Sequence, residues 1–377
     1  MLADVWSIAR RRLAAALIVA LFVAAGAAWL FHGESDAKPG PPGLSSVLAA
    51  LDAPAQAMTG PLGAFEGGHE WLNSRPLAAA DLRGKVVLVN FWTYSCINSL
   101  RPLPYVRAWA AKYRDRGLVV IGVHTPEFGF EKNPANVRRA LAQQGVSYPV
   151  VLDNTEQIWR AFGNSAWPTF YFIGADGRVQ GKVEGEGNYG QSERLIQTLL
   201  SKARREPVKD PIVAVGGVGG QAAPDWGDQR SGETYVGYAK ATGVAAQGGL
   251  KPDVGTLYRP ASRIPLNHWS PSGQWRVGPE FATLVGSSGA IAYRFHARDL
   301  NFVLAPAPDG RPVRFRVRVD GADPGADHGF DTDPQGRGQI RDARMYQLVR
   351  QARPVADRTF EIEFLDPGAR AYVFTFG

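Results

Sequence analysis

The feature that most constrains the fold is a buried-strand pattern followed closely by the only cysteine of the chain. Val86–Phe91 is mostly apolar, as strands buried inside parallel sheets are. Cys96 comes five residues later, and the segment from Ile97 to about Asp115 is predicted to form a helix. A thiol at a strand-to-helix junction lies at the positive end of the helix dipole, which favours the thiolate. The sequence therefore predicts a reactive thiol. The alternative is a cysteine that packs as a small hydrophobe.

Strand and helix patterns alternate on both sides of this segment. Leu118–His124 is a second predicted buried strand, and Thr169–Ile173 and Arg178–Glu184 flank an Asp-Gly turn typical of a hairpin. Helical patterns lie between them, and a last amphipathic helix is predicted over Gln191–Ala203. The fold class predicted for this part is α/β, with a mixed sheet and helices on both faces.

Two motifs in this region resemble the thioredoxin superfamily. Cys96-Ile97-Asn98-Ser99 stands where that superfamily has its Cys-x-x-Cys pair at the start of a helix. Trp167-Pro168-Thr169 stands where it has a cis-proline that lies against the active cysteine. The resemblance implies that Cys96 is the nucleophile, supported by Asn98, Ser99, Trp167, Pro168 and Thr169.

Longer stretches narrow the resemblance. Asp81–Trp92 is similar to the TlpA-like redoxins, which overlap with the AhpC/TSA group. Trp92–Asn98 and His124–Phe128 resemble the extracytoplasmic part of DipZ-type proteins. The resemblance implies thiol–disulfide exchange outside the cytoplasm with a thiol or disulfide partner, either a protein or a small thiol. The sequence departs from this family at one important position, because Ser99 stands where the family has its second, resolving cysteine.

A single thiol leaves several chemistries open. Cys96 can exchange disulfides with an external thiol, reduce a peroxide through a sulfenic acid, or hold a partner covalently. Thr93 and Cys96 have the spacing of a peroxiredoxin motif, but Val89 stands where that motif has proline. A non-catalytic module that binds the cell wall or a partner is a further alternative.

Other side chains are predicted to support the thiol. Glu127 follows the second buried strand and is expected to shuttle protons there, the alternative being a solvated loop residue. Trp92 and Tyr94 are expected to shield the thiol or to form a docking surface, the alternative for Trp92 being core packing. His124 is expected to pack. No cofactor and no metal-ligand set is predicted.

The N-terminal segment predicts a membrane anchor. Leu13–Phe31 is an apolar stretch of about 19 residues, enough to cross a bilayer, and Arg10–Arg12 precede it on the cytoplasmic side. The alternative is a cleaved signal peptide. The anchor predicts a single-pass protein of the inner membrane with its globular domains in the periplasm. The predicted boundaries are a cytoplasmic N-terminus at 1–12, the anchor at 13–31, linkers at 32–63 and 206–232, a thioredoxin-like domain at 64–205 and a β-sandwich at 233–377.

The last 145 or so residues lose the helical pattern and show short strands between turn signals, which indicates an antiparallel β-sandwich, with a jelly roll as one form. Trp269, Trp275 and Tyr293 are expected in its core. It resembles carbohydrate-binding modules, which implies cell-wall sugar contact through exposed aromatic residues. The candidates are Trp226, Tyr235, Tyr238 and Trp269, the alternative for these residues being core packing and the alternative for the domain being a structural or partner-docking role. The net charge of +7 forms no basic stripe, so nucleic-acid binding is excluded.

Overall fold

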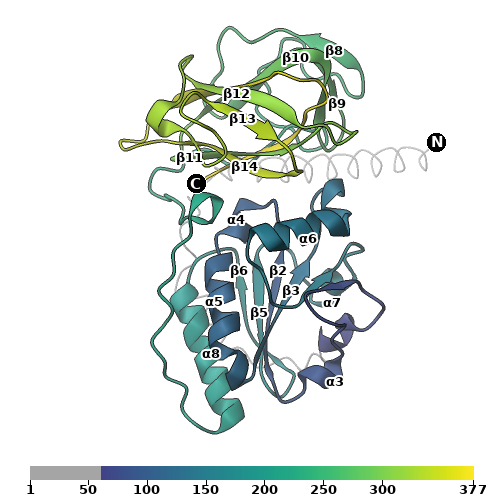
Figure 1. The fold of residues 1–377 in the computed structure, drawn as a ribbon, viewed down its shortest axis with the longest axis vertical. Coiled ribbons are helices and arrows are strands. Elements are labelled where there is room, and N and C mark those ends of the chain that lie inside the picture. Colours follow the sequence, from purple (N-terminus) through teal and green to yellow (C-terminus); the bar gives the residue numbers. More distant parts are fainter. Residues whose placement is uncertain (1–60) are drawn as a thin grey trace, which may run out of the picture. The chain divides into compact units, whose positions relative to one another are not determined.

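The structure is a computed structural model that describes residues 61–377 (Figure 1). Its first domain is built on a six-stranded sheet with the strand order β1-β4-β3-β2-β5-β6. Strands β2, β3 and β4 run parallel, while β1, β5 and β6 are antiparallel to their neighbours. The strands are β1 (Trp71–Leu72), β2 (Val86–Trp92), β3 (Leu118–His124), β4 (Val150–Leu152), β5 (Thr169–Ile173) and β6 (Val179–Glu184).

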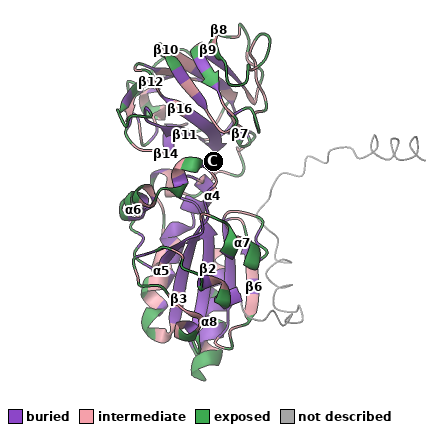
Figure 2. Cartoon of the chain, turned by 90° about the vertical axis from the view of Figure 1, so that its right-hand side faces the viewer, coloured by how far each residue is buried: buried purple, intermediate pink, exposed green. Residues whose placement is uncertain are grey.

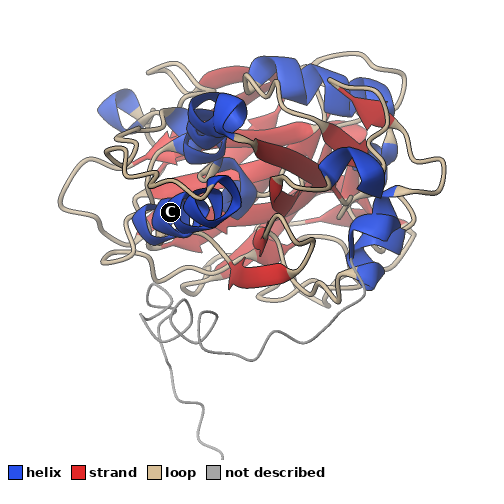
Figure 3. Cartoon of the chain, turned by 90° about the horizontal axis from the view of Figure 1, so that it is seen from below, coloured by secondary structure: helices blue, strands red, loops and turns tan. Residues whose placement is uncertain are grey.

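Helices lie in layers against this sheet (Figure 3). The α-helices are α3 (Ala79–Leu82), α4 (Ile97–Leu100), α5 (Leu103–Tyr113), α6 (Pro134–Gln143), α7 (Gln157–Ala161) and α8 (Tyr189–Arg204). Short 3-10 turns are η1 (Pro61–Phe65), η2 (Arg114–Arg116) and η3 (Gly129–Lys132). All seven residues of β2 are buried, because other elements cover both faces of this central strand. The predicted α/β architecture is therefore confirmed, and it is thioredoxin-like.

The helix after Cys96 differs from the sequence prediction. In place of one helix to Asp115, α4 ends after a single turn and α5 begins again at Leu103. Pro102 lies at the junction, where its ring favours the start of a helix and disfavours its interior. A one-turn helix carries little dipole, so the predicted stabilisation of a Cys96 thiolate loses its main support.

The second domain, called the β domain below, is an antiparallel sheet of ten strands. Strand β10 joins its two halves, because it pairs with β9 and β15 over residues 289–294 and with β16 near Ala282. The sheet curls into a half-barrel around one apolar core. The strands are β7 (Thr234–Tyr235), β8 (Gly255–Tyr258), β9 (His268–Val277), β10 (Ala282–Phe295), β11 (Asp299–Ala305), β12 (Val313–Val319), β13 (Arg337–Ile340), β14 (Arg344–Arg350), β15 (Arg358–Phe364) and β16 (Arg370–Phe376), with 3-10 turns η4 (Gly219–Gln221) and η5 (Gly325–Asp327).

The predicted all-β character of this part is confirmed, and so is the core position of three aromatic residues. Trp269, Trp275 and Tyr293 are fully buried. Two predicted strands, 281–285 and 290–296, are one continuous strand, β10, whose register shifts at a bulge-like irregularity between Leu284 and Gly289. A jelly-roll or carbohydrate-binding class stays a prediction.

Strands β11, β14 and β16 have both faces covered (Figure 2). Phe302 and Phe374 point into the core of the β domain, whereas Val303 and Val373 belong to the apolar cluster of the first domain. The register of β16 against β11 skips Tyr372, so this residue and Val373 both face the first domain. The outer face of the β domain is therefore packed against the first domain.

No helix within residues 61–377 is long and apolar enough to span a membrane. The predicted anchor at 13–31, the cytoplasmic N-terminus at 1–12 and nearly all of the linker at 32–63 lie outside the described residues.

Candidate active site

Cys96 lies at the carboxyl end of the central strand β2 and is the N-cap residue of α4. The buried loop Thr93–Ser95 connects it to the strand. The thiol is a free cysteine of intermediate exposure. Cys96 is thus a partly exposed residue among side chains that are mostly buried.

The surroundings of Cys96 raise the pKa of its thiol to about 12. The main cause is the loss of solvation among packed neighbours, and the negative charges of Glu127 and Glu233 add to it. Hydrogen bonds from the backbone and hydroxyl of Ser99 act in the opposite direction but do not offset the loss of solvation. The expectation of a favoured thiolate is wrong for this arrangement of the two domains, because burial outweighs the local donors.

Ser99 occupies the position of a resolving cysteine one turn after Cys96. Its amide donates to the Cys96 carbonyl at 3.0 Å, and its hydroxyl accepts from the Thr93 amide at 3.4 Å. The side chain is buried. Ser99 therefore helps to fix the loop and contacts the thiol, as a second cysteine there would.

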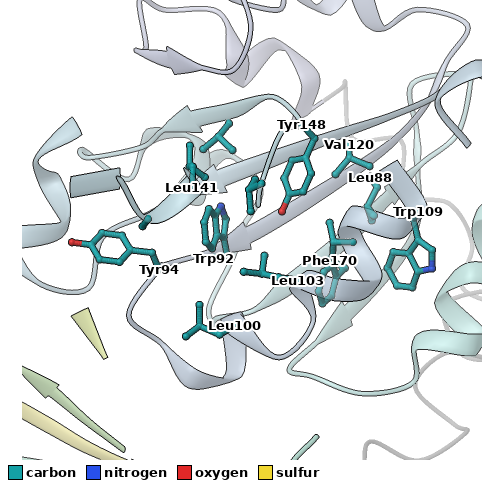
Figure 4. Close-up of a cluster of buried hydrophobic side chains, with 14 of the residues drawn as sticks. Leu88, Trp92, Tyr94, Leu100, Leu103, Trp109, Val120, Leu141, Tyr148 and Phe170 are labelled. Carbon is teal, nitrogen blue, oxygen red and sulfur yellow. The ribbon is translucent and has the colours of Figure 1, made fainter. Parts of the chain in front are cut away.

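Trp92 and Tyr94 are both buried (Figure 4), and the rings of both contact His124. The Trp92 ring meets the imidazole edge-on at 5.7 Å, and the Tyr94 ring stacks on it at 5.6 Å. Burial lowers the pKa of His124 to about 3, so this histidine is neutral and packs, as expected. Trp92 is part of the core cluster with Leu103 and Leu141.

The structure places a buried carboxylate beneath the loop that the sequence analysis missed. Glu131 is fully buried in η3 and accepts hydrogen bonds from Thr93 Oγ1 at 2.5 Å and Ser95 Oγ at 2.6 Å. It also accepts from the backbone amides of Ser95, Glu127 and Phe128. Burial raises the pKa of Glu131, although these donors oppose the shift. This single side chain fixes the loop before Cys96.

The predicted proline lies at the same edge of the sheet. The Trp167–Pro168 peptide bond is cis, as predicted. Thr169 pairs with Phe91 across β2 and β5, which places Pro168 beside the end of β2. Thr169 Oγ1 donates to the Ala166 carbonyl at 2.8 Å, and the Trp167 ring packs on Trp159.

Asn98 accepts weakly from Arg101 at 3.5 Å, and Arg101 is the more informative residue. Its buried guanidinium forms an ion pair with Glu186 at 2.8 Å and donates to the carbonyl of Phe376 at 3.0 Å. Because the buried guanidinium of Arg101 has both of these partners, it links the end of α4 to β16, the last strand of the β domain. Sequence patterns gave no signal for this contact.

Glu127 faces the β domain. Its carboxylate accepts from the hydroxyl of Tyr235 at 2.5 Å, and Lys240 Nζ lies 3.5 Å away. Only 10% of the Glu127 side chain is exposed, so it is not the solvated loop residue of the alternative interpretation. Tyr235, a predicted sugar contact, is instead part of this cluster.

Apolar contacts close the remaining surface around Cys96. Tyr94, Ile97 and Leu100 belong to the same buried cluster as Met345 and Tyr372 of the β domain. An open pocket of about 450 Å³ borders this contact and is lined by residues of both domains, Tyr94 and Arg344 among them. In this arrangement a large disulfide substrate has little direct access to the sulfur.

The other predicted sugar contacts differ in exposure. Trp269 is fully buried in the core, whereas Trp226 and Tyr238 are 38% and 37% exposed. Arg101 lies over the Trp226 ring at 5.9 Å, and the Tyr238 hydroxyl donates to Asp253 at 3.1 Å. Core packing therefore accounts for Trp269, and sugar contact stays a prediction for the other two.

Two family models match the chain. Residues 64–182 match the AhpC/TSA family, and residues 231–377 match a thioredoxin-like C-terminal domain. The chain is 37% identical to the protein DipZ of Mycobacterium bovis over 258 residues, which cover 66% of this chain and 36% of DipZ. The predicted relationship to redoxins and to DipZ is confirmed. The chain spans about a third of the length of that relative.

Shorter matches cover the redoxin part alone. The thiol-disulfide oxidoreductase ResA of Bacillus anthracis is 27% identical over 128 residues, 34% of this chain and 71% of ResA. Among solved structures, a putative thiol:disulfide interchange protein DsbE from Chlorobium tepidum is 25% identical, with a TM-score of 0.30, over 32% of this chain and 84% of that one.

Proposed function

We propose that this protein is an extracytoplasmic thiol–disulfide oxidoreductase that acts through the single thiol of Cys96. The observation that carries the proposal is the place of Cys96. It caps a helix at the carboxyl end of the central strand β2, and the cis-proline Pro168, which directly precedes β5, lies beside the end of the same strand. The relative ResA, which is named as a thiol-disulfide oxidoreductase, supports the same chemistry.

The proposed reaction needs a partner thiol because Ser99 cannot resolve a disulfide. The Cys96 thiol loses its proton and attacks a substrate disulfide; one S–S bond forms, the substrate S–S bond breaks, and the released thiolate takes up a proton. An external thiol then attacks the mixed disulfide and regenerates Cys96. The external thiol leaves joined to the second substrate sulfur, so each cycle of Cys96 releases one substrate thiol and one mixed disulfide. A second external thiol attacks that mixed disulfide, and the substrate is then fully reduced at the expense of two external thiols.

The raised pKa of Cys96 sets the conditions of this cycle. Almost all of the thiol is protonated at neutral pH while the β domain covers it, so exchange is slow in the closed arrangement. We propose that a partner gains access by loosening the contact around Tyr94 and Met345.

The test is catalysed exchange by the full chain between a neutral small disulfide, such as hydroxyethyl disulfide, and excess thiol. The expected result is turnover that Cys96→Ala abolishes and that Ser99→Ala retains. Equal rates for the wild-type chain and Cys96→Ala would overturn the proposal.

A second function is favoured by the same high pKa. A covered, protonated thiol beside Ser99 also suits a module that holds a partner without turning over. A thiol-dependent peroxidase has less support, because Thr93 Oγ1 donates to Glu131. Partner capture that is unaffected by Cys96→Ala would favour the binding module, and peroxide consumption that requires Cys96 would favour the peroxidase.

The location and the domain limits are part of the proposal. The apolar stretch 13–31 and its preceding arginines support a single-pass anchor in the inner membrane with both domains in the periplasm. The proposed domain limits stay those of the sequence analysis, and the proposed partners are a protein disulfide or a small thiol. Contact with cell-wall carbohydrate is proposed only through the β domain. Protease protection in sealed vesicles of the opposite orientations tests the location.

A further inference from the structure

Tyr235 of the β domain joins two carboxylates beside the candidate active site. Its hydroxyl lies 2.5 Å from Glu127 Oε1 of the first domain and 3.0 Å from Glu233 Oε2 of its own segment. The three side chains are called the acidic triad below. Neither domain contains the whole triad, so it exists only because the domains are packed together.

With both carboxylates ionised, the triad would have a single hydrogen for two hydrogen bonds. A phenol donates one proton, and it cannot donate to both carboxylates at once. The short distance favours donation to Glu127, so Glu233 is left to carry its own proton and to donate it to the phenol oxygen. Loss of solvation and the charge of Glu127 raise the pKa of Glu233, in agreement with this count.

The triad forms a path from solvent toward the thiol. Glu233 reaches solvent, Tyr235 is partly buried, and the Glu127 side chain is 10% exposed. The Glu127 amide and the amide and hydroxyl of Ser95, the residue before Cys96, donate to the same Glu131 carboxylate, which holds Glu127 near the thiol. The charge of Glu127 accordingly raises the pKa of the Cys96 thiol. No hydrogen bond within residues 61–377 joins Glu127 to the sulfur, so the transfer between them passes through solvent or the substrate.

Two other charged groups face the triad across a pocket of about 230 Å³. Lys240 Nζ lies 3.5 Å from Glu127 and 4.5 Å from the centre of the Tyr235 ring. Glu280 accepts from the amide of Gly129 at 2.8 Å and is not hydrogen bonded to the triad. Lys240 stabilises the charge of Glu127, and Glu280 offers a matched control.

We propose that Glu233, Tyr235 and Glu127 form a proton relay that serves Cys96, with the β domain supplying two of its three members. The relay rests on the proposed function. When Cys96 attacks a disulfide, its proton goes to Glu127, and Glu233 releases its own proton to solvent. The Tyr235 proton then moves to Glu233 as the Glu127 proton moves to Tyr235, which restores the starting arrangement. The released substrate thiolate takes up a proton from solvent, and no electrons move in these transfers.

The experiment is the pH dependence of Cys96 alkylation by iodoacetamide in the reduced full chain. Glu127→Gln is expected to lower the midpoint by about half a pH unit or more, since it removes the carboxylate that is charged in the starting arrangement, and Glu233→Gln, which replaces the protonated carboxyl, is expected to lower it less. The two shifts are expected to be non-additive in the double variant, and additive once Tyr235→Phe has removed the connecting hydroxyl. Glu280→Gln is expected to leave the midpoint unchanged.

Additive shifts in the chain that keeps Tyr235, or no shift in either single variant, would overturn the relay. The solvent-reaching Glu233→Gln keeps the test decisive if a Glu127 variant folds poorly. Alkylation needs no disulfide substrate, so a chain without exchange activity still reports whether the triad is coupled to Cys96. Failure of the relay and failure of the proposed function are therefore seen separately.

Discussion

At the scale of single residues, the chemistry of Cys96 is limited by what stands beside it. Ser99 occupies the resolving position and its hydroxyl contacts the thiol, but it cannot attack a disulfide. Its side chain is buried one helical turn from Cys96, the geometry that a Cys-x-x-Cys pair needs. The site is therefore one side chain away from a two-cysteine centre.

We predict that Ser99→Cys restores an internal disulfide. Oxidation of this variant should join the introduced sulfur to Cys96, and turnover with a neutral disulfide should rise by at least about tenfold, because the second step becomes intramolecular. Thiol counting and intact mass after oxidation check the bond, and Ser99→Ala is the control without a second sulfur. Two free thiols after oxidation would contradict the geometry.

The neutral, buried state of His124 predicts a pH dependence of stability. The unfolded residue titrates near 6.5 and the folded one near 3, so only the unfolded chain gains a proton between these values. The free energy of unfolding should fall by about 1.4 kcal/mol per pH unit as pH drops through this window. Urea unfolding at several pH values measures the slope. His124→Phe keeps a ring against Tyr94 and should lack this contribution to the pH slope of the unfolding free energy. Equal slopes for the wild-type chain and the variant would contradict the prediction.

At the scale of elements, the position of β2 depends on close packing under Trp92. A Cβ on Gly122 of β3 would lie 2.9 Å from the Trp92 indole nitrogen and 3.2 Å from atoms of Tyr148 and Val150. Only a residue without a side chain fits between these three. The same packing holds Trp92 in the core, and it is where the loop to Cys96 begins.

We expect Gly122→Ala to lower the free energy of unfolding by about 1–3 kcal/mol, because the neighbours must move to admit a methyl group. Denaturant unfolding gives the value. Gly63→Ala, in η1 with open space around the position, is the matched control and should be near neutral. Equal stabilities for the two variants would show that Trp92 relaxes freely.

Elements also show what sequence patterns can and cannot predict. The apolar runs of β2 and β3 and the turn before β6 were sufficient to place the central sheet. Pro102 is visible in the sequence, but the helical patterns before and after it favour one continuous helix, so the break between α4 and α5 was not predicted. Glu131 had no periodic signal, because a single loop carboxylate is recognised only when its donors are assembled around it.

At the scale of the whole molecule, the β domain is a cover for the redoxin centre. The continuous apolar runs of β11 and β16 indicate strands that are covered on both faces. A strand with one face in water would alternate apolar and polar residues, so these runs were a signal that the sequence prediction did not use. Tyr372 contacts Phe128, Phe130 and Phe281 with ring centres about 5 Å apart. No local pattern in either half predicts which faces meet.

We predict that Tyr372→Leu loosens this cover. The variant should lose about 1–3 kcal/mol of stability and should expose Cys96, so alkylation at pH 8 should become several-fold faster. Phe360→Leu, in the core of the β domain, is the control that loses comparable packing without touching the contact. Unchanged alkylation in Tyr372→Leu, or equal acceleration in both variants, would contradict a covering role.

The central claim, that Cys96 exchanges disulfides in the native protein, is tested most directly by trapping its mixed disulfide. The reduced full chain is mixed with hydroxyethyl disulfide at pH 7 and pH 9, and intact mass is followed with time. We predict one adduct per chain, faster at pH 9, absent in Cys96→Ala and released by added thiol. A thiol that stays unmodified until the protein is denatured would contradict the account and leave the chain a non-catalytic module.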